Sequence, residues 1–262
     1  VINFVKVNLD PSFKTLLDQT QNQFIKYSFS NHLTTSTRYS FTYNQQDLKK
    51  QKSFSFFRIN LESSGNILRG LYNLSNSITP NTFVKDNQDR YTFLNIAYSQ
   101  YLRSDFDYRY YFHLKGNAKT VLRFAAGVGK PLANFKVLPF ERSFFSGGPN
   151  GLRAWQSRTI GPGSYTNQKF SYDRFGDGQL EANIEHRFKI FKMLNGAFFI
   201  DAGNVWLQKP DASRPGGDFK LDRFYKEIAV GTGFGLRMDF NFFIIRLDWG
   251  IKAHDPQFSE NK

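Results

Sequence analysis

The chain has 262 residues, no cysteine, 18% aromatic residues and a formal net charge of +13, and its mean hydropathy is −0.49. No stretch approaches the run of about eighteen uncharged apolar residues that a membrane helix needs, and the first residues lack the pattern of a signal peptide, so the chain is expected to be soluble or to cross a membrane as strands. The basic residues alternate with apolar ones instead of clustering on one element, which argues against a nucleic-acid partner.

The first quarter of the chain carries three short alternating patterns. Apolar side chains at every second position over residues 25–30, 37–44 and 57–62 predict strands with one apolar face. The polar run 47–52 predicts a turn between the second and third. From residue 63 to about residue 88 the alternation is lost among Ser, Asn and Gly, which predicts a long loop.

The clearest alternation follows, over residues 105–115. One face holds only apolar and aromatic side chains, namely Phe106, Tyr108, Tyr110, Phe112 and Leu114. The other face includes Asp105, Asp107 and Arg109. A soluble two-layer sandwich could not easily bury the first face and hydrate the second, whereas a strand between lipid and a wet lumen does both. Gly116 and Asn117 predict a tight turn into the next strand, over residues 120–128.

The last part of the chain alternates again over residues 179–190, 197–206, 228–240 and 243–252. Connections after Leu114, Ile190 and Phe240 are short, whereas those after Glu62, Val128 and Trp206 are long. Outer-membrane barrels have short periplasmic turns and long extracellular loops. The sequence therefore predicts an all-β fold, an antiparallel transmembrane β-barrel of which roughly 9–11 strands are in this chain.

The segment from Pro131 to about Gly178 is too irregular for a strand or a helix, and a loop of this length is uncommon and usually functional. Its glycines alone could belong to a flexible surface loop. Arg153, however, lies between a Gly-Gly-Pro turn and an aromatic residue. At this position its guanidinium can form a bidentate ion pair with a carboxylate.

Three ordered motifs in this half of the chain resemble the C-terminal barrel of BamA/TamA-type outer-membrane assembly factors, the bacterial surface antigen superfamily. They are FSGGPNGLRAW at 145–155 with IGPG at 160–163, GDGQLEANIEHRF at 176–188, and FIDAGNVW at 199–206. The loop motif comprises Gly147, Gly148, Pro149, Leu152, Arg153, Trp155, Gly161 and Pro162. The strand motif comprises Gly176, Asp177, Glu181 and Gly203. The resemblance covers residues 106–252 well and the preceding third loosely.

The resemblance implies that the long loop folds back into the lumen and that its arginine pairs with acidic residues on the barrel wall. Carried over, Arg153 is that arginine, Asp201 its first partner and Glu185 its second. The alternation independently puts Glu185 and Asp201 on the charged face of their strands. The sequence departs from the family at Ala154, where the family has Gly, and at Trp155, where it has Phe or Tyr.

The family barrel has about sixteen strands, more than this chain supplies. Residues 1–262 are therefore expected to be a fragment of a C-terminal transmembrane β-barrel domain, with periplasmic modules, the first strands and the last strand outside the sequence. An open sheet in lipid would leave backbone groups unpaired.

The function implied by the resemblance is an assembly factor of the bacterial outer membrane that promotes the folding and insertion of β-barrel clients. Its partners would be membrane lipid, unfolded outer-membrane proteins and accessory subunits of an assembly complex, without a cofactor. Two alternatives stay open: a two-partner-type secretion pore for a polypeptide, and a passive porin or structural surface antigen in which the glycine-rich segment only narrows the pore.

An enzyme is not expected. The four histidines, at positions 32, 113, 186 and 254, have no metal-ligand spacing, and Gly127-Val128-Gly129-Lys130 lacks the full phosphate-loop pattern. Asp105 and Asp107 could face one another for acid–base work, but solvation in a lumen is the simpler account.

Overall fold

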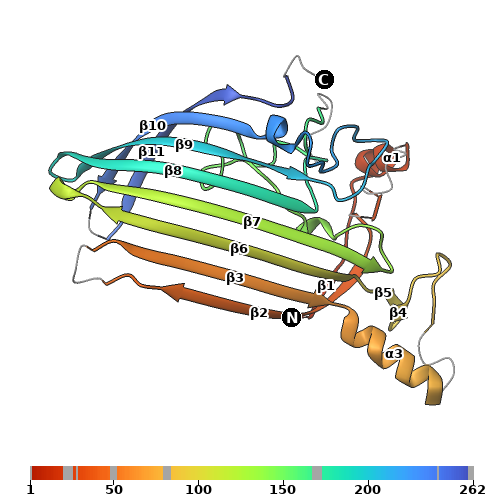
Figure 1. The fold of residues 1–262 in the computed structure, drawn as a ribbon. Helices are drawn as coiled ribbons and strands as arrows, with labels where there is room; N and C mark the ends of the chain where they lie inside the picture. Colours follow the sequence, from red (N-terminus) through yellow and green to blue (C-terminus); the bar gives the residue numbers. More distant parts are fainter. Residues whose placement is uncertain are drawn as a thin grey trace. The chain divides into compact units, whose positions relative to one another are not determined.

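The computed structural model describes residues 2–19, 26–27, 29–47, 52–78, 84–166, 173–240 and 242–258. Its main feature is a nine-stranded sheet in the order β1-β2-β3-β6-β7-β8-β9-β10-β11 (Figure 1). The strands are β1 (Ile2–Val5), β2 (His32–Asn44), β3 (Phe54–Ser64), β6 (Gln100–His113), β7 (Lys119–Ala133), β8 (Gly178–Phe191), β9 (Leu194–Trp206), β10 (Ala229–Asp239) and β11 (Ile244–His254). Strands β1 and β11 end this order, so the sheet of the described residues is not closed. The predicted all-β, partial-barrel fold is confirmed.

Period-two alternation located eight of these strands. Their registers are antiparallel in the pairs β8–β9, β9–β10 and β10–β11. The connections β6–β7, β8–β9 and β10–β11 are short. By contrast, residues 65–99, 134–177 and 207–228 separate β3 from β6, β7 from β8 and β9 from β10. The predicted asymmetry of loop lengths is therefore confirmed.

The helices were not predicted. Residues 66–78, expected to be loop, form helix α3 (Asn66–Ile78), which is followed by a two-stranded hairpin of β4 (Thr92–Phe93) and β5 (Ile96–Ala97). Helix α1 (Pro11–Gln19) precedes β2. Its first turn has Pro at the start and the Asp10 carboxylate accepting the Ser12 N–H at 2.9 Å, as in an N-cap.

The strand expected at residues 25–30 was wrong. Residues 26–27 are helical and 29–30 form a turn, while residues 25 and 28 lie outside the described part of the chain. The Phe29 ring packs instead on Phe13 of α1 and on Phe140, with ring centroids 5.2 and 5.8 Å apart. Packing of Phe29 between non-strand elements therefore took the place of a sheet face.

The chain divides into two compact units. Unit 1 comprises residues 1–40, 60–104 and 128–143, and unit 2 comprises residues 41–59, 105–127 and 144–262. Leu33, Leu68 and Tyr98 form a buried cluster in unit 1. A second cluster, in unit 2, consists of Leu152, Trp155, Ile160 and Ala229.

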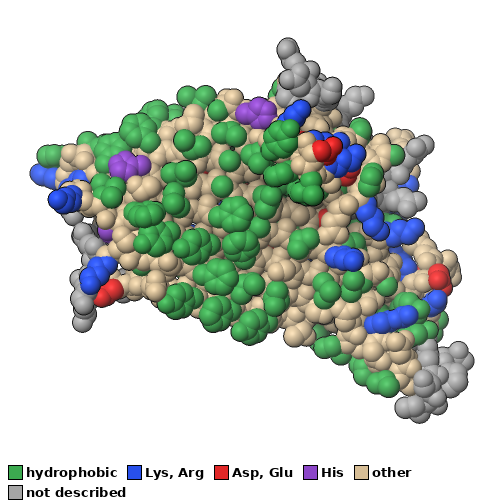
Figure 2. All heavy atoms as spheres, in the orientation of Figure 1, with side chains coloured by type: hydrophobic (Ala, Val, Ile, Leu, Met, Phe, Trp, Pro, Cys, Tyr) green, Lys and Arg blue, Asp and Glu red, His purple; other side chains and the backbone are tan. Residues whose placement is uncertain are grey.

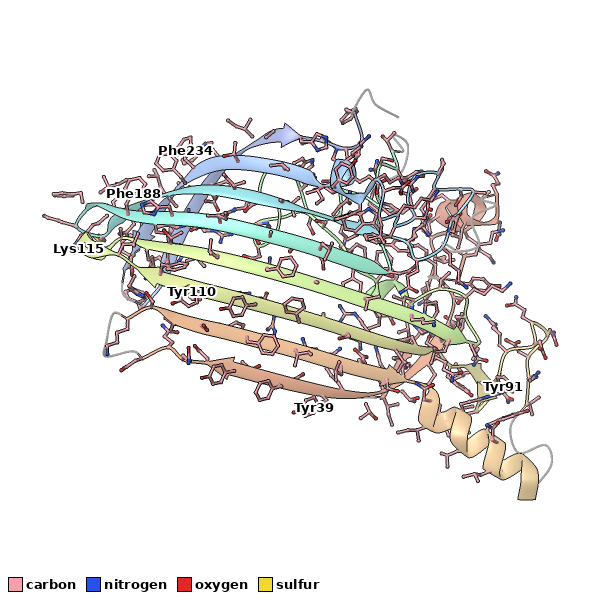
Figure 3. The ribbon with its side chains drawn as sticks, in the orientation of Figure 1. Tyr39, Tyr91, Tyr110, Lys115, Phe188 and Phe234 are labelled. Carbon is pink, nitrogen blue, oxygen red and sulfur yellow. The ribbon has the colours of Figure 1, made fainter. Side chains whose placement is uncertain are left out.

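The two faces of the unit 2 strands differ sharply. On one face, large apolar side chains are 40–59% exposed, namely Tyr108, Phe124, Ile184, Phe198, Phe234 and Leu247, and Phe106 is half-buried. On the opposite face Asp107, Glu181, Glu185 and Asp201 are at most 7% exposed. Figure 2 shows hydrophobic side chains gathered over the strands, and Figure 3 shows Tyr110, Phe188 and Phe234 among them. None of the described helices is long and apolar enough to span a membrane.

Candidate functional site

The loop before β8 is closed on itself around residues 146–160. The Phe144 and Gly176 backbones exchange two hydrogen bonds of 2.9 Å, which fixes both ends of the loop. Within it, the Gly148 N–H donates to the Trp155 carbonyl at 2.9 Å. Gly147 has a φ of +97°, and a Cβ there would collide with the Gln156 carbonyl. This position therefore requires glycine, and the resulting tight turn presents Arg153.

The Arg153 guanidinium lies on the charged face of β8 and β9. Its Nε and Nη2 donate to the two Asp201 oxygens at 2.8 and 2.7 Å, its backbone N–H donates to Asp201 Oδ2 at 3.0 Å, and its Nη1 donates to Glu185. The guanidinium also stacks 3.6 Å from the centroid of the Phe199 ring. The side chains of Arg153, Asp201 and Glu185 are only 6%, 0% and 9% exposed. The structure thus brings together Arg153, Asp201 and Glu185, and we call this cluster the loop-to-lumen lock.

The carboxylate of Glu185 extends the network towards the last strands. It accepts Arg187 Nε at 2.6 Å and Arg237 Nη2 at 3.3 Å. Arg237 Nη1 reaches Asp248 at 2.7 Å, and Arg246 Nε reaches the same carboxylate at 3.0 Å. Charges of both signs therefore alternate from β8 to β11, and each of these buried carboxylates has a cationic partner.

A second arginine, Arg123 of β7, lies on the other side of the lock. Arg123 donates to Asp107, Glu181 and Asn183, each at 2.9 Å. The Asn183 amide donates in turn to Asp201 Oδ1 at 2.8 Å and to the carbonyl of the loop residue Gly151 at 2.9 Å. The lock and the Arg123 cluster are therefore one network.

A comparison with known protein families finds that the Omp85 superfamily domain matches residues 16–262. The chain belongs to the Omp85 superfamily. It is 27% identical over 116 residues to the outer membrane protein assembly factor BamA of Neisseria meningitidis serogroup B, a match that covers 41% of this chain and 14% of that protein. Among solved structures, BamA of Haemophilus ducreyi without POTRA domains 1–3 aligns with a TM-score of 0.46 and 16% identity, over 87% of this chain and 52% of that one. Membership of the Omp85 superfamily and the similarity to BamA locate the chain in the outer membrane of Gram-negative bacteria.

Ala154 and Trp155, the two residues at which this Omp85 loop departs from the family pattern, pack against the backbone of two glycines. A Cβ on Gly250 would lie 2.7 Å from Ala154 Cα, and one on Gly231 would lie 2.8 Å from Ala154 Cβ and 2.9 Å from the Trp155 ring. The Trp155 indole is buried in the unit 2 cluster and donates to Asp255 Oδ2 at 3.0 Å. Glycines on β10 and β11 therefore make room for Ala-Trp after the arginine.

The remaining loop-motif residues lie beside β9, β10, β11 and the β9–β10 loop. A Cβ on Gly161 would lie 2.6 Å from the Asn204 and Val205 side chains. Pro162 lies next to Gly217. The Pro149 carbonyl accepts a hydrogen bond from Arg246. Leu152, at 0% exposure, belongs to the unit 2 cluster, and Gly148 has a φ of +89°.

The strand-motif residues allow close backbone approach between β8 and β9. A Cβ on Gly176 would lie 2.6 Å from the Trp206 carbonyl, and one on Gly203 would lie 2.5 Å from the Leu180 carbonyl. The Asp177 N–H donates to the Trp206 carbonyl at 2.8 Å. The Asp177 carboxylate, in turn, accepts the Gln208 N–H at 3.1 Å.

Sequence reasoning missed several buried polar residues that join the loops. Asn204 donates to the carbonyls of Gly163 and Glu227, and the Trp206 indole donates to Glu227 Oε2 at 2.7 Å. Trp206 alternates in register with the exposed Phe198 on β9, but these contacts leave it only 2% exposed. Arg214, with a fully buried side chain, reaches the Phe175 carbonyl at 3.4 Å and stacks 4.8 Å from its ring. Asn204 lies near the end of β9 and Arg214 lies in the β9–β10 loop, and neither position gives a periodic signal by which its partner could be found.

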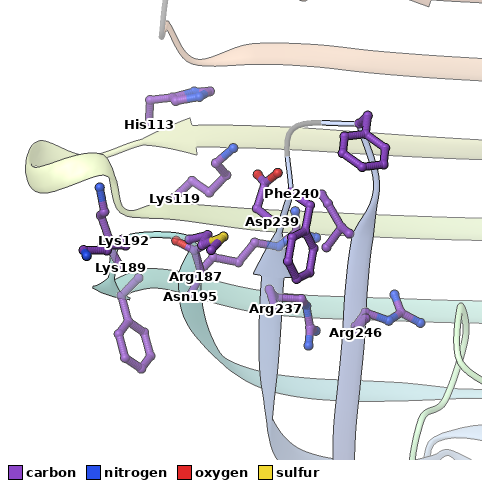
Figure 4. Close-up of a pocket in the computed structure, with 14 residues that line it drawn as sticks. His113, Lys119, Arg187, Lys189, Lys192, Asn195, Arg237, Asp239, Phe240 and Arg246 are labelled. Carbon is purple, nitrogen blue, oxygen red and sulfur yellow. The ribbon is translucent and has the colours of Figure 1, made fainter.

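A cavity of about 880 Å³ opens among the ends of β6, β7, β8, β10 and β11 at the short connections (Figure 4). Among the described residues, its cationic lining consists of Lys119, Arg187, Lys189, Lys192, Arg237 and Arg246, and its acidic lining of Asp239. Part of the basic excess of the chain is thus gathered here. Within the described ranges, no group of three His, Cys, Asp or Glu side chains could hold a metal ion.

Proposed function

We propose that this Omp85 chain forms part of the membrane-embedded barrel of a protein that promotes the folding and insertion of β-barrel clients in the outer membrane. Superfamily membership supports the proposal, as does the similarity to a protein named as an outer membrane protein assembly factor. The match covers only 14% of that protein, and we propose that residues 1–262 are part of a C-terminal barrel domain in a longer chain. Membrane lipid, unfolded clients and accessory subunits are the proposed partners, and the role needs neither a cofactor nor bond cleavage.

The observation that carries the proposal is the buried pairing of Arg153 with Asp201 and Glu185. Removing one partner of a buried ion pair leaves an uncompensated charge and costs about 3–5 kcal/mol. A loop held in this way keeps its place against β8 and β9 while strands elsewhere separate to admit a client. The proposed role of Arg153 is therefore that of a lock on the loop.

The buried ion pair of Arg153 also argues against the two alternatives. A secretion pore that opens by withdrawing the loop would have to separate Arg153 from two carboxylates in each opening event. A passive porin needs its loop only to narrow the lumen, for which a buried, bidentate arginine is unnecessary.

A double-mutant cycle tests the lock in the full-length protein in cells. The variants are Arg153→Ala, Asp201→Asn and their combination, and the readouts are assembly of β-barrel clients and protease resistance of the loop. Each single variant is expected to lower both readouts, and the double variant is expected to be little worse than either, because the pair is already lost.

Arg158→Ala is the matched control. Arg158 is in the same loop but is exposed and stacks on the Phe145 ring, 4.3 Å from its centroid, so its loss is expected to leave client assembly intact. Additive effects of Arg153→Ala and Asp201→Asn, or normal client assembly in both, would contradict the proposal.

A further inference from the structure

Helix α3, within unit 1, exposes an apolar face. Ile67, Leu71 and Leu74 are 67%, 48% and 65% exposed, and their spacing of four and three residues places them on one side of the helix. The helix contains no acidic residue, and Arg69 is its only charged residue. Thirteen residues are marginal for an isolated helix in water, so α3 depends on what it packs against.

The start of α3 is fixed to the sheet. Gly65 has a φ of +70°, and a Cβ on it would lie 2.6 Å from the Ser99 carbonyl, so the chain turns from β3 into α3 at a position that only glycine fits. The Gly65 N–H donates to the Thr35 carbonyl of β2 at 2.9 Å. As Figure 1 shows, α3 leaves directly from the end of β3.

The helix packs on the outward side of the strands. Leu33 is on the same side of β2 as Tyr39, because alternate residues of a strand share a face. Tyr39 is 61% exposed, whereas Leu33 is 8% exposed because it packs against Leu68 of α3 and Tyr98. On β6, Gln100 shares a face with Leu102, and its side-chain amide donates to Asn66 of α3 at 2.7 Å.

The outward side of unit 1 is apolar beyond the helix. Four apolar side chains of its strands are 42–50% exposed, namely Leu61, Leu102, Val128 and Leu132. Since the outward faces of Omp85 strands lie in lipid, the apolar stripe of α3 continues a surface that contacts the bilayer. Figure 2 shows hydrophobic side chains in the region of α3.

The other flank of α3 is polar. The Arg69 guanidinium stacks 3.6 Å from the Tyr91 ring centroid and 5.1 Å from that of Tyr72, and Asn73 is exposed. An apolar stripe on one flank and a polar flank beside it are the features of helices that lie in the headgroup region of a bilayer.

We propose that α3 is an interfacial helix whose Ile67, Leu71 and Leu74 side chains insert into the bilayer at the long-loop end of β3. In this position the helix fixes the end of β3 at the membrane surface. The proposal needs the outer-membrane location of the chain but not the Arg153 lock, so its failure would leave the proposed function untouched.

Site-directed spin labels test the proposal in the full-length protein, made free of cysteine where necessary and reconstituted in phosphatidylcholine vesicles. Labels are placed one at a time at Leu71, Leu74, Asn73 and Tyr39, and their collision rates with oxygen and with a water-soluble nickel chelate are measured. Labels at Leu71 and Leu74 are expected to favour oxygen as the Tyr39 label does. The Asn73 label is expected to favour the nickel chelate.

Two results would overturn the proposal. Nickel accessibility at Leu71 and Leu74 equal to that at Asn73 would place the helix in water, and protection of both sites from oxygen and nickel alike would mean that a protein covers the stripe. Tryptophan substitutions give a second measurement that does not require labelling. Leu74→Trp fluorescence is expected to shift to the blue and to be quenched by brominated phosphatidylcholine, whereas Asn73→Trp fluorescence is expected to do neither.

Discussion

Arg153 has a role that its shape makes possible. Its guanidinium binds Asp201 with two N–H groups, contacts Glu185 with a third and lies over the Phe199 ring. A lysine ammonium is a point charge on a flexible stem, so it cannot keep a bidentate contact and a stacking contact at once. The geometry therefore selects arginine in particular and not positive charge in general.

Arg153→Lys is expected to destabilise the docked loop even though the charge is kept. The expected cost is below the roughly 3–5 kcal/mol of removing one partner of a buried pair, because one hydrogen bond to Asp201 can survive. Hydrogen exchange of residues 146–160 in the reconstituted protein measures the cost, with Arg158→Lys as the control. Exchange rates in Arg153→Lys equal to those of the control would show that the bidentate geometry of arginine stabilises the loop no more than the positive charge alone does.

The β9–β10 loop contains an acid whose protonation state bears on stability. Burial alone would raise the pKa of Asp211, but hydrogen bonds from the Ser213 hydroxyl and N–H, together with the Arg214 guanidinium at 2.9 Å, hold it below its ordinary value. A carboxylate with a lowered pKa stabilises the folded loop above its ordinary pKa and loses that contribution as the pH falls through the folded value.

Protection of residues 207–228 from hydrogen exchange, corrected for intrinsic rates, is therefore expected to be constant from neutral pH to about pH 5 and to fall below about pH 4. In Asp211→Asn the protection should be lower at neutral pH, and this part of the pH dependence should be absent. An unchanged pH profile in Asp211→Asn would assign the effect to another acid.

Among the helices and strands, an element can be predicted from the sequence when the environment of its side chains repeats with a regular period. Each strand from β6 to β11 has lipid on one side and polar groups on the other, so period two identifies these strands and puts Glu185 and Asp201 on one face. Helix α3 has a weak sequence signal, because its Ser, Asn and Gly are typical of loops and its stability comes from Leu68 packing on Tyr98 and Leu33. Its helical structure was not predictable from local pattern alone.

The site was predictable only as far as the strands reach. Strand parity and resemblance named Arg153, Glu185 and Asp201, but the contact of Asn183 with Gly151 and the contacts of Arg214 depend on the path of the loops. A path of that kind is determined by contacts between residues that are far apart in the sequence, such as Asn183 with Gly151 at 2.9 Å. Local periodicity contains no information about such pairs.

The close approach of the loop to β11 gives a prediction for Gly250→Ala. The new Cβ would lie 2.7–3.0 Å from backbone atoms of Ala154 and Arg153, which cannot move without displacing the lock. Overpacking of this kind costs about 1–3 kcal/mol, to be measured by urea unfolding in detergent or vesicles. Gly178→Ala is the control, since its Cβ would be in ordinary contact, 3.5 Å from the Gly127 carbonyl. Equal midpoints for the two variants would contradict the close approach.

Over the whole molecule, a net charge of +13 coexists with a lipid-facing surface because the charged and apolar side chains occupy opposite faces of the same strands. Arginines on the polar face are matched by buried carboxylates, while the short-connection end keeps an excess of cations around its cavity (Figure 4). Part of the basic composition therefore lies on the inner face and at one end of the strands.

Phe234→Arg tests this division. Phe234 is 47% exposed and stacks on Trp249 with ring centroids 4.9 Å apart (Figure 3). An arginine on the lipid face near the bilayer midplane is expected to cost about 2–4 kcal/mol of folding free energy, whereas Phe234→Leu should cost far less because the surface stays apolar. The difference is measured by reversible urea unfolding in vesicles. A cost for Phe234→Arg no greater than that of Phe234→Leu would mean that this face is in water.

The glycines that pack against Ala154 also restrict which substitutions related sequences can accept. At Gly250 the loop backbone itself fills the space of a side chain, and at Gly231 the methyl of Ala154 and the ring of Trp155 fill it. A methyl group at position 231 needs glycine at position 154 and a smaller or displaced side chain at position 155, whereas alanine at position 154 needs glycine at position 231. Positions 154 and 231, 77 residues apart along the chain, are therefore expected to change together during evolution.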